Sequence, residues 1–232
     1  DSKLISISDD TDVVYTPYQI ESEQEKYVYK IDELVYNKTY DLNQDKLPKL
    51  NYLNYTMHAL TYKTDFLRNI GFYQQEGISY TDTEYVYYPF VLAKKFVAFD
   101  LVLYNYVIGI EGQTVSVSSM RRNERHYWKL IDRFLANRSL NGNLNAYQIR
   151  KNILTVIIRP IMDLYIQYSE YDEEKEKSIR QLLLRIKDSD ILIYNHIISL
   201  KRKSFFYPYK LWLLNGRLFF MLHGSLLFKS FF

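Results

Sequence analysis

The pattern of apolar and polar positions changes near the middle of the chain. In the first 120 residues, short apolar runs predict β-strands at Asp12–Tyr18, Thr56–Tyr62 and Ala98–Ile108, the last of them a buried strand. A helix is predicted over Tyr85–Phe96. Residues 19–50, with a brief alternation in Lys26–Lys30, indicate a hairpin or a long insertion. This part of the chain is therefore expected to have an α/β fold.

From Arg121 onward the apolar positions repeat every three or four residues, which is the spacing of one face of an α-helix. Three helices are predicted in this way, the second kinked at Pro160 and the third starting after Asp172. Their expected buried positions are Tyr127, Leu130, Ile131, Phe134 and Leu135; Ile149, Ile153, Leu154, Ile157, Ile161, Leu164 and Tyr168; and Ile179, Leu182, Leu183 and Ile186. We therefore predict two domains, an α/β domain over residues 1–120 and an all-helical C-terminal domain over residues 121–232.

Composition narrows the compartment in which the protein is expected. The chain has no cysteine, which excludes a disulfide framework and thiolate chemistry and is typical of a reducing compartment. It has no signal-peptide pattern and no charge-free apolar run of about 20 residues. We therefore expect a cytoplasmic protein.

The basic residues are concentrated at the C-terminal end. Residues 191–232 carry six Lys or Arg and no Asp or Glu, and the remaining 24 cations are outnumbered by 27 acidic residues. The body of the chain is therefore not expected to bind nucleic acid. The aromatic, Leu-rich and cationic segment 205–232 is typical of a helix in a membrane interface, so residues 201–232 are expected to bind the anionic inner face of the cell membrane. The alternatives are a helix that packs in the core and a helix that dimerises.

Three motifs follow one another in the first half of the chain. They are Asn69–Glu84 (NIGFYQQEGISYTDTE), Leu103–Tyr106 (LYNY) and Gly112–Ser116 (GQTVS). In this order they resemble the acceptor side of bacterial glycosyltransferase family 2, in which an NI.F.EG..YEDT.F segment precedes a helix, a strand ending in an aromatic LY.Y and a Gly-Ser loop. Tyr62–Leu67 (YKTDFL) and Asp12–Val14 (DVV) also resemble segments of that family.

This resemblance implies a GT-A fold and an inverting transfer from a nucleotide sugar to a saccharide or lipid-linked saccharide acceptor, in surface polysaccharide biosynthesis. The family's nucleotide-binding half and its Asp-x-Asp metal site precede the first resembling strand, and neither is recognisable in this chain. We therefore expect a partial GT-A sheet, with the strand around Val13–Tyr18 at an edge that lacks its partners. Magnesium or manganese is expected in the intact enzyme, with no metal ligand in this chain, and the fragment alone is expected to be inactive.

The same resemblance implies the site residues. Asp82 matches the carboxylate of the family's ED pair, the general base beside the acceptor hydroxyl. Thr81 stands where the family has Glu, which removes one acidic group, and Glu84 is the candidate to compensate for it. His58, just before the motifs, is a further candidate for contact with substrate. Gln113 is a candidate to order a loop over the acceptor.

Each of these assignments has a structural alternative. Asp82 and Thr83 are both good N-caps for a helix beginning near Glu84. A lone histidine such as His58 is often a structural residue, and Gly-Gln-Thr is an ordinary turn composition. The alternative for the whole chain is a non-catalytic carbohydrate-binding or membrane-adaptor module, which Thr81 and the missing donor half would permit.

Overall fold

The computed structural model describes residues 7–50, 54–109, 116–137, 142–168, 171–201, 208–216 and 219. The chain forms two compact units: a first unit of residues 1–113 and 139–153, and a second unit of residues 114–138 and 154–232. The boundary predicted near residue 120 is close to the first division between them. Residues 139–153, which the sequence assigned to the helical domain, belong to the first unit instead.

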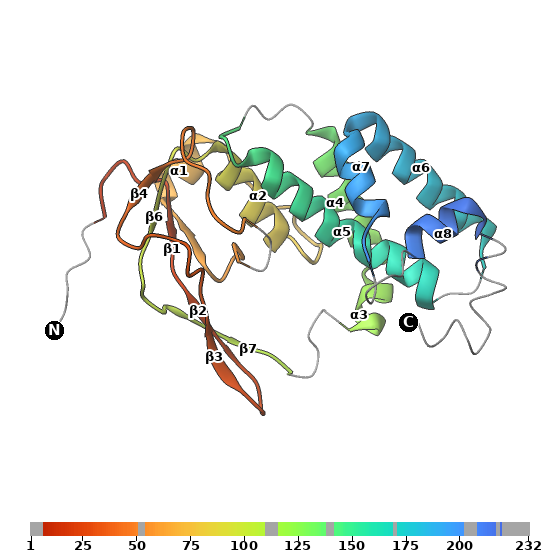
Figure 1. Cartoon of the computed structure of the whole chain (residues 1–232), viewed down its shortest axis with the longest axis horizontal. Helices are drawn as coiled ribbons and strands as arrows, with labels where there is room; N and C mark the ends of the chain where they lie inside the picture. The colour runs from red at the N-terminus through yellow and green to blue at the C-terminus, as the bar shows by residue number, and fades with distance from the viewer. Residues whose placement is uncertain are drawn as a thin grey trace. The chain divides into compact units, whose positions relative to one another are not determined.

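The first unit is built on a four-stranded sheet with the order β4–β6–β1–β5 (Figure 1). Its strands are β1 (Val13–Tyr15), β4 (Thr39–Asp41), β5 (Leu60–Tyr62) and β6 (Lys95–Ala98). Because β1 pairs with β5 on one side and with β6 on the other, the prediction of an open edge at Val13–Tyr18 is wrong. The strand ends at Tyr15, so Pro17, which has no N–H to donate, falls outside the ladder.

Aromatic side chains fill the core beneath this sheet. Helix α2 (Asp82–Leu92) contributes Phe90, whose ring centroid lies 6.3 Å from that of Phe96 on β6 and 5.9 Å from that of Tyr55. Tyr15 on β1 contacts both Tyr55 and Phe96. All four rings have at most a trace of exposed surface, so they join α2 to the sheet.

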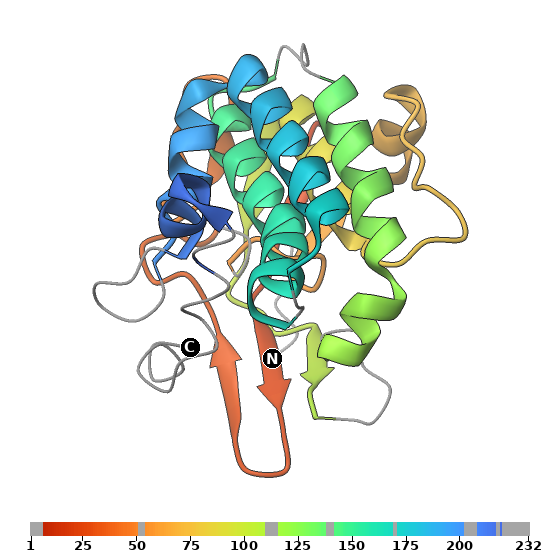
Figure 2. The same cartoon turned by 90° about the vertical axis from the view of Figure 1, so that its right-hand side faces the viewer.

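A second sheet in the first unit has the order β3–β2–β7. Its strands are β2 (Tyr18–Glu21), β3 (Lys26–Tyr29) and β7 (Tyr104–Val107). The predicted hairpin is confirmed as β2–β3, and Figure 2 shows β7 beside it, parallel to β2. The prediction of one buried strand over Ala98–Ile108 is wrong, because β6 ends at Ala98 and the apolar residues Leu101–Leu103 are exposed before β7 begins in the other sheet.

Two buried asparagines attach residues 142–145 to the first unit. The Asn143 side chain donates to the carbonyl oxygens of Phe90 (2.6 Å) and Ala93 (3.0 Å) at the end of α2. The Asn145 side chain accepts from the backbone N–H of Leu47 at 2.9 Å. Gly142 allows this approach, since a Cβ there would lie 2.3 Å from the Val91 side chain. These long-range contacts explain why residues 139–153 leave the predicted helical domain.

Helices make up the described part of the second unit. They are α3 (Val117–Arg122), α4 (Glu124–Ala136), the later part of α5 (Ala146–Tyr168), α6 (Glu173–Ser189), α7 (Ile191–Ile198) and α8 (Pro208–Leu214); the first unit also has α1 (Thr64–Asn69). The buried positions predicted for α4, α5 and α6 are confirmed, except that the side chain of Tyr168 lies outside the described residues. Asp172 caps α6 by accepting from the backbone N–H of Lys175. The observed class is therefore mixed α/β with small sheets and several helices.

Helix α8 packs against the other helices of the second unit. The Trp212 ring is fully buried, in an edge-to-face contact with Tyr165 at 5.8 Å and beneath the Arg180 guanidinium at 4.7 Å. The Tyr209 hydroxyl donates to a carboxylate oxygen of Asp163 at 2.6 Å. Phe219 is also buried, so the core-packing alternative holds for Trp212 and Phe219; residues 220–232 lie outside the described residues. In the described ranges, no helix has both the length and the apolar content needed to cross a membrane.

Candidate functional site

The three-stranded sheet of the first unit has one aromatic face and one polar face. Tyr18 on β2 lies opposite Tyr29 on β3 and Tyr104 on β7, so the three tyrosines share a face. On the other face, the Gln19 side chain donates to Asn105, which in turn donates to the Glu21 carboxylate. The polar side chains of the second face therefore bond to each other. His58 packs on the aromatic face.

His58 packs on this aromatic face. Its imidazole stacks on Tyr104 with ring centroids 4.7 Å apart and an interplanar angle of 19°, and on Tyr106 at 4.2 Å and 27°. Tyr18 lies 5.5 Å away at a steeper angle. We call His58, Tyr18, Tyr104 and Tyr106 the His58 cluster. Tyr104 keeps 42% of its surface exposed, so this side of the cluster is open to solvent.

Burial controls the charge of His58. Desolvation lowers the pKa of its imidazole below the usual value of about 6.5, and the negative charge of Asp82 opposes this shift without cancelling it. The Nδ1 atom is buried and has no hydrogen-bond partner among the described residues. A buried N–H without a partner is costly, which favours the neutral tautomer with its proton on Nε2. His58 is therefore mainly neutral at pH 7.

The free energy of unfolding is expected to fall as the pH is lowered below about 6.5, because unfolded His58 takes up a proton more readily than folded His58. With a depressed folded pKa, this contribution is complete above the unfolded pKa and is lost as the pH falls through the folded pKa. His58→Phe retains a ring but cannot titrate, so it should lose less stability than the parent between about pH 7 and pH 5. Denaturant unfolding of both proteins across this range measures the difference.

Burial also lowers the pKa of His126. His126 is present in both the parent and His58→Phe, so its effect on the free energy of unfolding cancels when the two pH profiles are compared. Identical pH profiles for the parent and His58→Phe would show that His58 is not held neutral by burial.

Asp82 is the first residue of α2 and is half-buried. A carboxylate at a helix N-terminus is stabilised by the helix dipole. Thr81, not Asp82, occupies the N-cap position, and it makes no side-chain capping bond. The Thr83 hydroxyl donates to the Tyr80 carbonyl oxygen at 2.7 Å. Because the helix begins two residues earlier than the capping alternative requires, Asp82 is not its N-cap.

The backbone leading to Asp82 is strained. Tyr80 has a φ of 68°, in the left-handed region that a bulky residue rarely adopts. Gly77, three residues earlier, has the same φ at no steric cost. The Gln74 side chain donates to the Thr81 carbonyl oxygen at 2.8 Å and helps to hold this loop. Strain of this kind is concentrated at functional sites and persists only when the surroundings enforce it.

Glu84 supports the loop from within. Its side chain is fully buried, and its Oε2 atom accepts from the backbone N–H of Gln75 at 2.9 Å. This hydrogen bond ties the loop at Gln75 to α2. Contact of Glu84 with substrate stays a prediction.

Of the five predicted site residues, Asp82 and His58 are linked by the effect of the Asp82 charge on the pKa of His58. Thr81 directly precedes Asp82 in the sequence, and Gln113 lies outside the described residues. Tyr18 was missed, because its place in the cluster depends on the pairing of β2 with β7, far apart in the sequence. In the described parts of the chain, no group of three or more His, Asp or Glu could hold a metal ion.

Comparisons with protein-family models, with curated proteins and with solved structures found no match to this chain.

Proposed function

We propose that this chain carries the acceptor side of an inverting glycosyltransferase, with Asp82 as general base. The observation that carries the proposal is the meeting of two motif segments: the charge of Asp82, from the TDTE segment, acts on His58, which stacks on Tyr104 and Tyr106 of the LYNY segment. The resemblance to glycosyltransferase family 2 rests on these same segments.

The chemistry assigned to Asp82 is the removal of a proton from an acceptor hydroxyl. As the acceptor oxygen forms its bond to the anomeric carbon of a nucleotide sugar, the bond from that carbon to the diphosphate breaks with inversion. The proton passes to the Asp82 carboxylate, and the leaving diphosphate takes the electron pair of the broken bond. Magnesium or manganese would neutralise that diphosphate when bound. The described residues supply no site for the metal, and we assign no donor-side step to them.

The His58 cluster is suited to hold the saccharide. A tyrosine ring offers an apolar face for the C–H groups of a sugar and a hydroxyl for hydrogen bonding. Burial raises the pKa of Tyr18 to about 12, so its hydroxyl keeps its proton at physiological pH. The half-exposed Tyr104 is the member of the cluster best placed to touch a ligand.

Tyr104→Ala is expected to weaken saccharide binding by about tenfold, because it removes the exposed stacking surface of the cluster. Saturation-transfer NMR titrations with methyl glycosides of glucose, galactose and N-acetylglucosamine measure the effect. Tyr27→Ala is the matched control, since Tyr27 lies on the same sheet with nearly the same exposure, 43%, and has no ring contact with His58 among those described. Equal binding by both variants would contradict the proposal.

The second candidate is a carbohydrate-binding module without catalysis. The same stacked rings favour it, since they bind a sugar whether or not Asp82 acts on it. For the membrane-adaptor form of this alternative, the burial of Trp212 and Phe219 removes two of the aromatic residues that lipid contact would use. The excess of cations over residues 191–232 remains as support for a peripheral position on an anionic membrane.

A further inference from the structure

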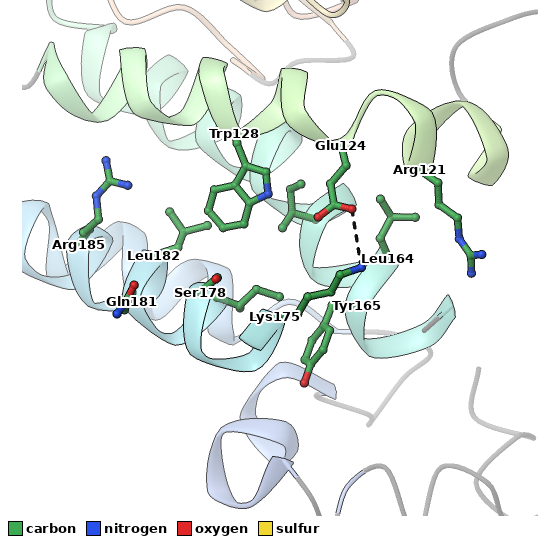
Figure 3. Close-up of a pocket in the computed structure, with 12 residues that line it drawn as sticks. Arg121, Glu124, Trp128, Leu164, Tyr165, Lys175, Ser178, Gln181, Leu182 and Arg185 are labelled. Atoms are coloured by element: carbon green, nitrogen blue, oxygen red, sulfur yellow. Dashed lines mark ion pairs between the residues drawn. The ribbon is translucent and has the colours of Figure 1, made fainter. Parts of the chain in front are cut away.

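The second unit contains a pocket of about 490 Å³ between α4, α5 and α6 (Figure 3). Its floor is apolar and consists of Ile161 and Leu164 from α5 and Ile179 and Leu182 from α6, all of them buried. A volume of this size is within the range of small-molecule sites, and an apolar floor is their usual lining.

Trp128 forms the aromatic wall of the pocket. It projects from α4 toward α6, and Figure 3 shows the indole over the space that Ser178 and Leu182 face from the other side. Trp128 is only half-buried, whereas Trp212, the other tryptophan, is fully enclosed by protein. The indole face is therefore available to a planar or aliphatic group within the pocket.

The rim of the pocket is mainly basic. Arg121, Lys175 and Arg185 line it, together with one acid, Glu124. The Lys175 and Glu124 side chains are 4.0 Å apart and 47% and 35% exposed, so this ion pair contributes little and can open to admit an anion. Arg185 pairs with Asp132 at 2.8 Å, and Asp132 does not line the pocket.

We propose that this pocket binds an amphipathic anion, that is, an apolar body bearing one phosphate or carboxylate. The apolar body lies on the floor against Trp128, and the anionic group lies at the rim, where Lys175 and Arg121 donate charge-assisted hydrogen bonds. Neither the apolar body nor the anionic group of the ligand matches the site alone. The floor has no polar group to hold a free anion, and the rim disfavours a neutral apolar end. The proposal does not depend on the reaction proposed for Asp82.

Titration calorimetry with decyl phosphate, decyl glucoside and inorganic phosphate, each below its micelle-forming concentration, tests both parts. Decyl phosphate should bind at least about tenfold more tightly than decyl glucoside, and inorganic phosphate should bind more weakly than either. A fourth titration with 1-naphthyl phosphate shows whether an aromatic body binds more tightly or less tightly than an alkyl chain, once decyl phosphate has been found to bind more tightly than decyl glucoside. Equal affinities for decyl phosphate and decyl glucoside would overturn it.

Two pairs of variants locate the binding. Ser178→Trp fills the pocket from an exposed position on α6 and should reduce decyl phosphate affinity by at least about tenfold, whereas Leu184→Trp, on the exposed side of the same helix, should leave it unchanged. Lys175→Gln should weaken decyl phosphate by about tenfold and decyl glucoside hardly at all, and Lys177→Gln is its charge-matched control.

Circular dichroism of each variant checks that it is folded. If Ser178→Trp does not fold, Lys175→Gln and Lys177→Gln test the proposal. If both variants lose affinity for decyl phosphate equally, or if neither does, no specific anion site exists at this pocket.

Discussion

If Asp82 is the general base of the proposed transfer, Asp82→Asn is expected to lower turnover by about 100-fold or more, the usual scale for loss of a general base. Asn has nearly the same shape as Asp but cannot take a proton from the acceptor hydroxyl. The fold should be unaffected, because Asp82 is half-buried at the first position of α2 and is not its N-cap. Transfer of labelled sugar from a nucleotide donor, measured at saturating acceptor, reports the change.

Asp65→Asn is the matched control. Asp65 is an acid in the first turn of α1, its side chain is 71% exposed, and it makes only a long contact of 3.4 Å with Arg68. The same change of charge at a helix start should therefore leave turnover within about threefold of the parent. If Asp82→Asn also stays in that range, Asp82 is not the base. Retained saccharide binding with no transfer activity in the parent itself would favour the non-catalytic module.

The features that sequence predicted well are those determined locally. The buried positions of α4 and α6 follow from a helical period that repeats within one segment, so Leu130 and Leu182 could be assigned without knowing their partners. The β2–β3 hairpin is also local. By contrast, β1 could not be placed at the centre of its sheet, because its two neighbours come from residues 60–62 and 95–98.

Exposed apolar residues and long-range polar contacts explain the other errors. Leu101–Leu103 have the composition of a buried strand, yet they are exposed between β6 and β7. Asn143 and Asn145 appear in a polar loop sequence, but their side chains bond to backbone groups far away in the sequence. The Asn143 side chain donates to carbonyl oxygens 53 and 50 residues away, and the Asn145 side chain accepts from an N–H 98 residues away, so the loop is fixed to the first unit. Hydrophobic periodicity has no signal for such contacts.

In the candidate site, too, local features could be predicted from the sequence and long-range contacts could not. Asp82 and His58 could be singled out from the motifs and their neighbourhood, but their proximity depends on how α2 packs beside the end of the loop before β5. For Glu84 the motif predicts contact with substrate, and the structure adds a contact that the motif does not show, with the backbone N–H of Gln75. A buried carboxylate that satisfies a loop cannot be distinguished from a substrate ligand by sequence alone.

Trp212→Ala is expected to lower the free energy of unfolding by about 3 to 5 kcal/mol. The indole is fully buried, contacts Tyr165 edge to face and lies beneath Arg180, so its removal leaves a cavity lined by groups that lose their contacts. Arg180 also donates to Glu176 at 2.8 Å and to the Leu213 carbonyl oxygen at 3.3 Å, which links α6 to α8 around the ring. Urea unfolding followed by circular dichroism measures the loss.

Leu214→Ala tests the same helix without a cavity. Leu214 is 83% exposed, so its truncation should change the free energy of unfolding by no more than about 0.5 kcal/mol. The composition of the tail suits either a lipid-facing helix or a core helix, and the two variants separate these cases. A core helix requires a large effect at Trp212 and none at Leu214. A lipid-facing α8 would give two small effects on unfolding, together with weaker co-sedimentation of Trp212→Ala with anionic vesicles.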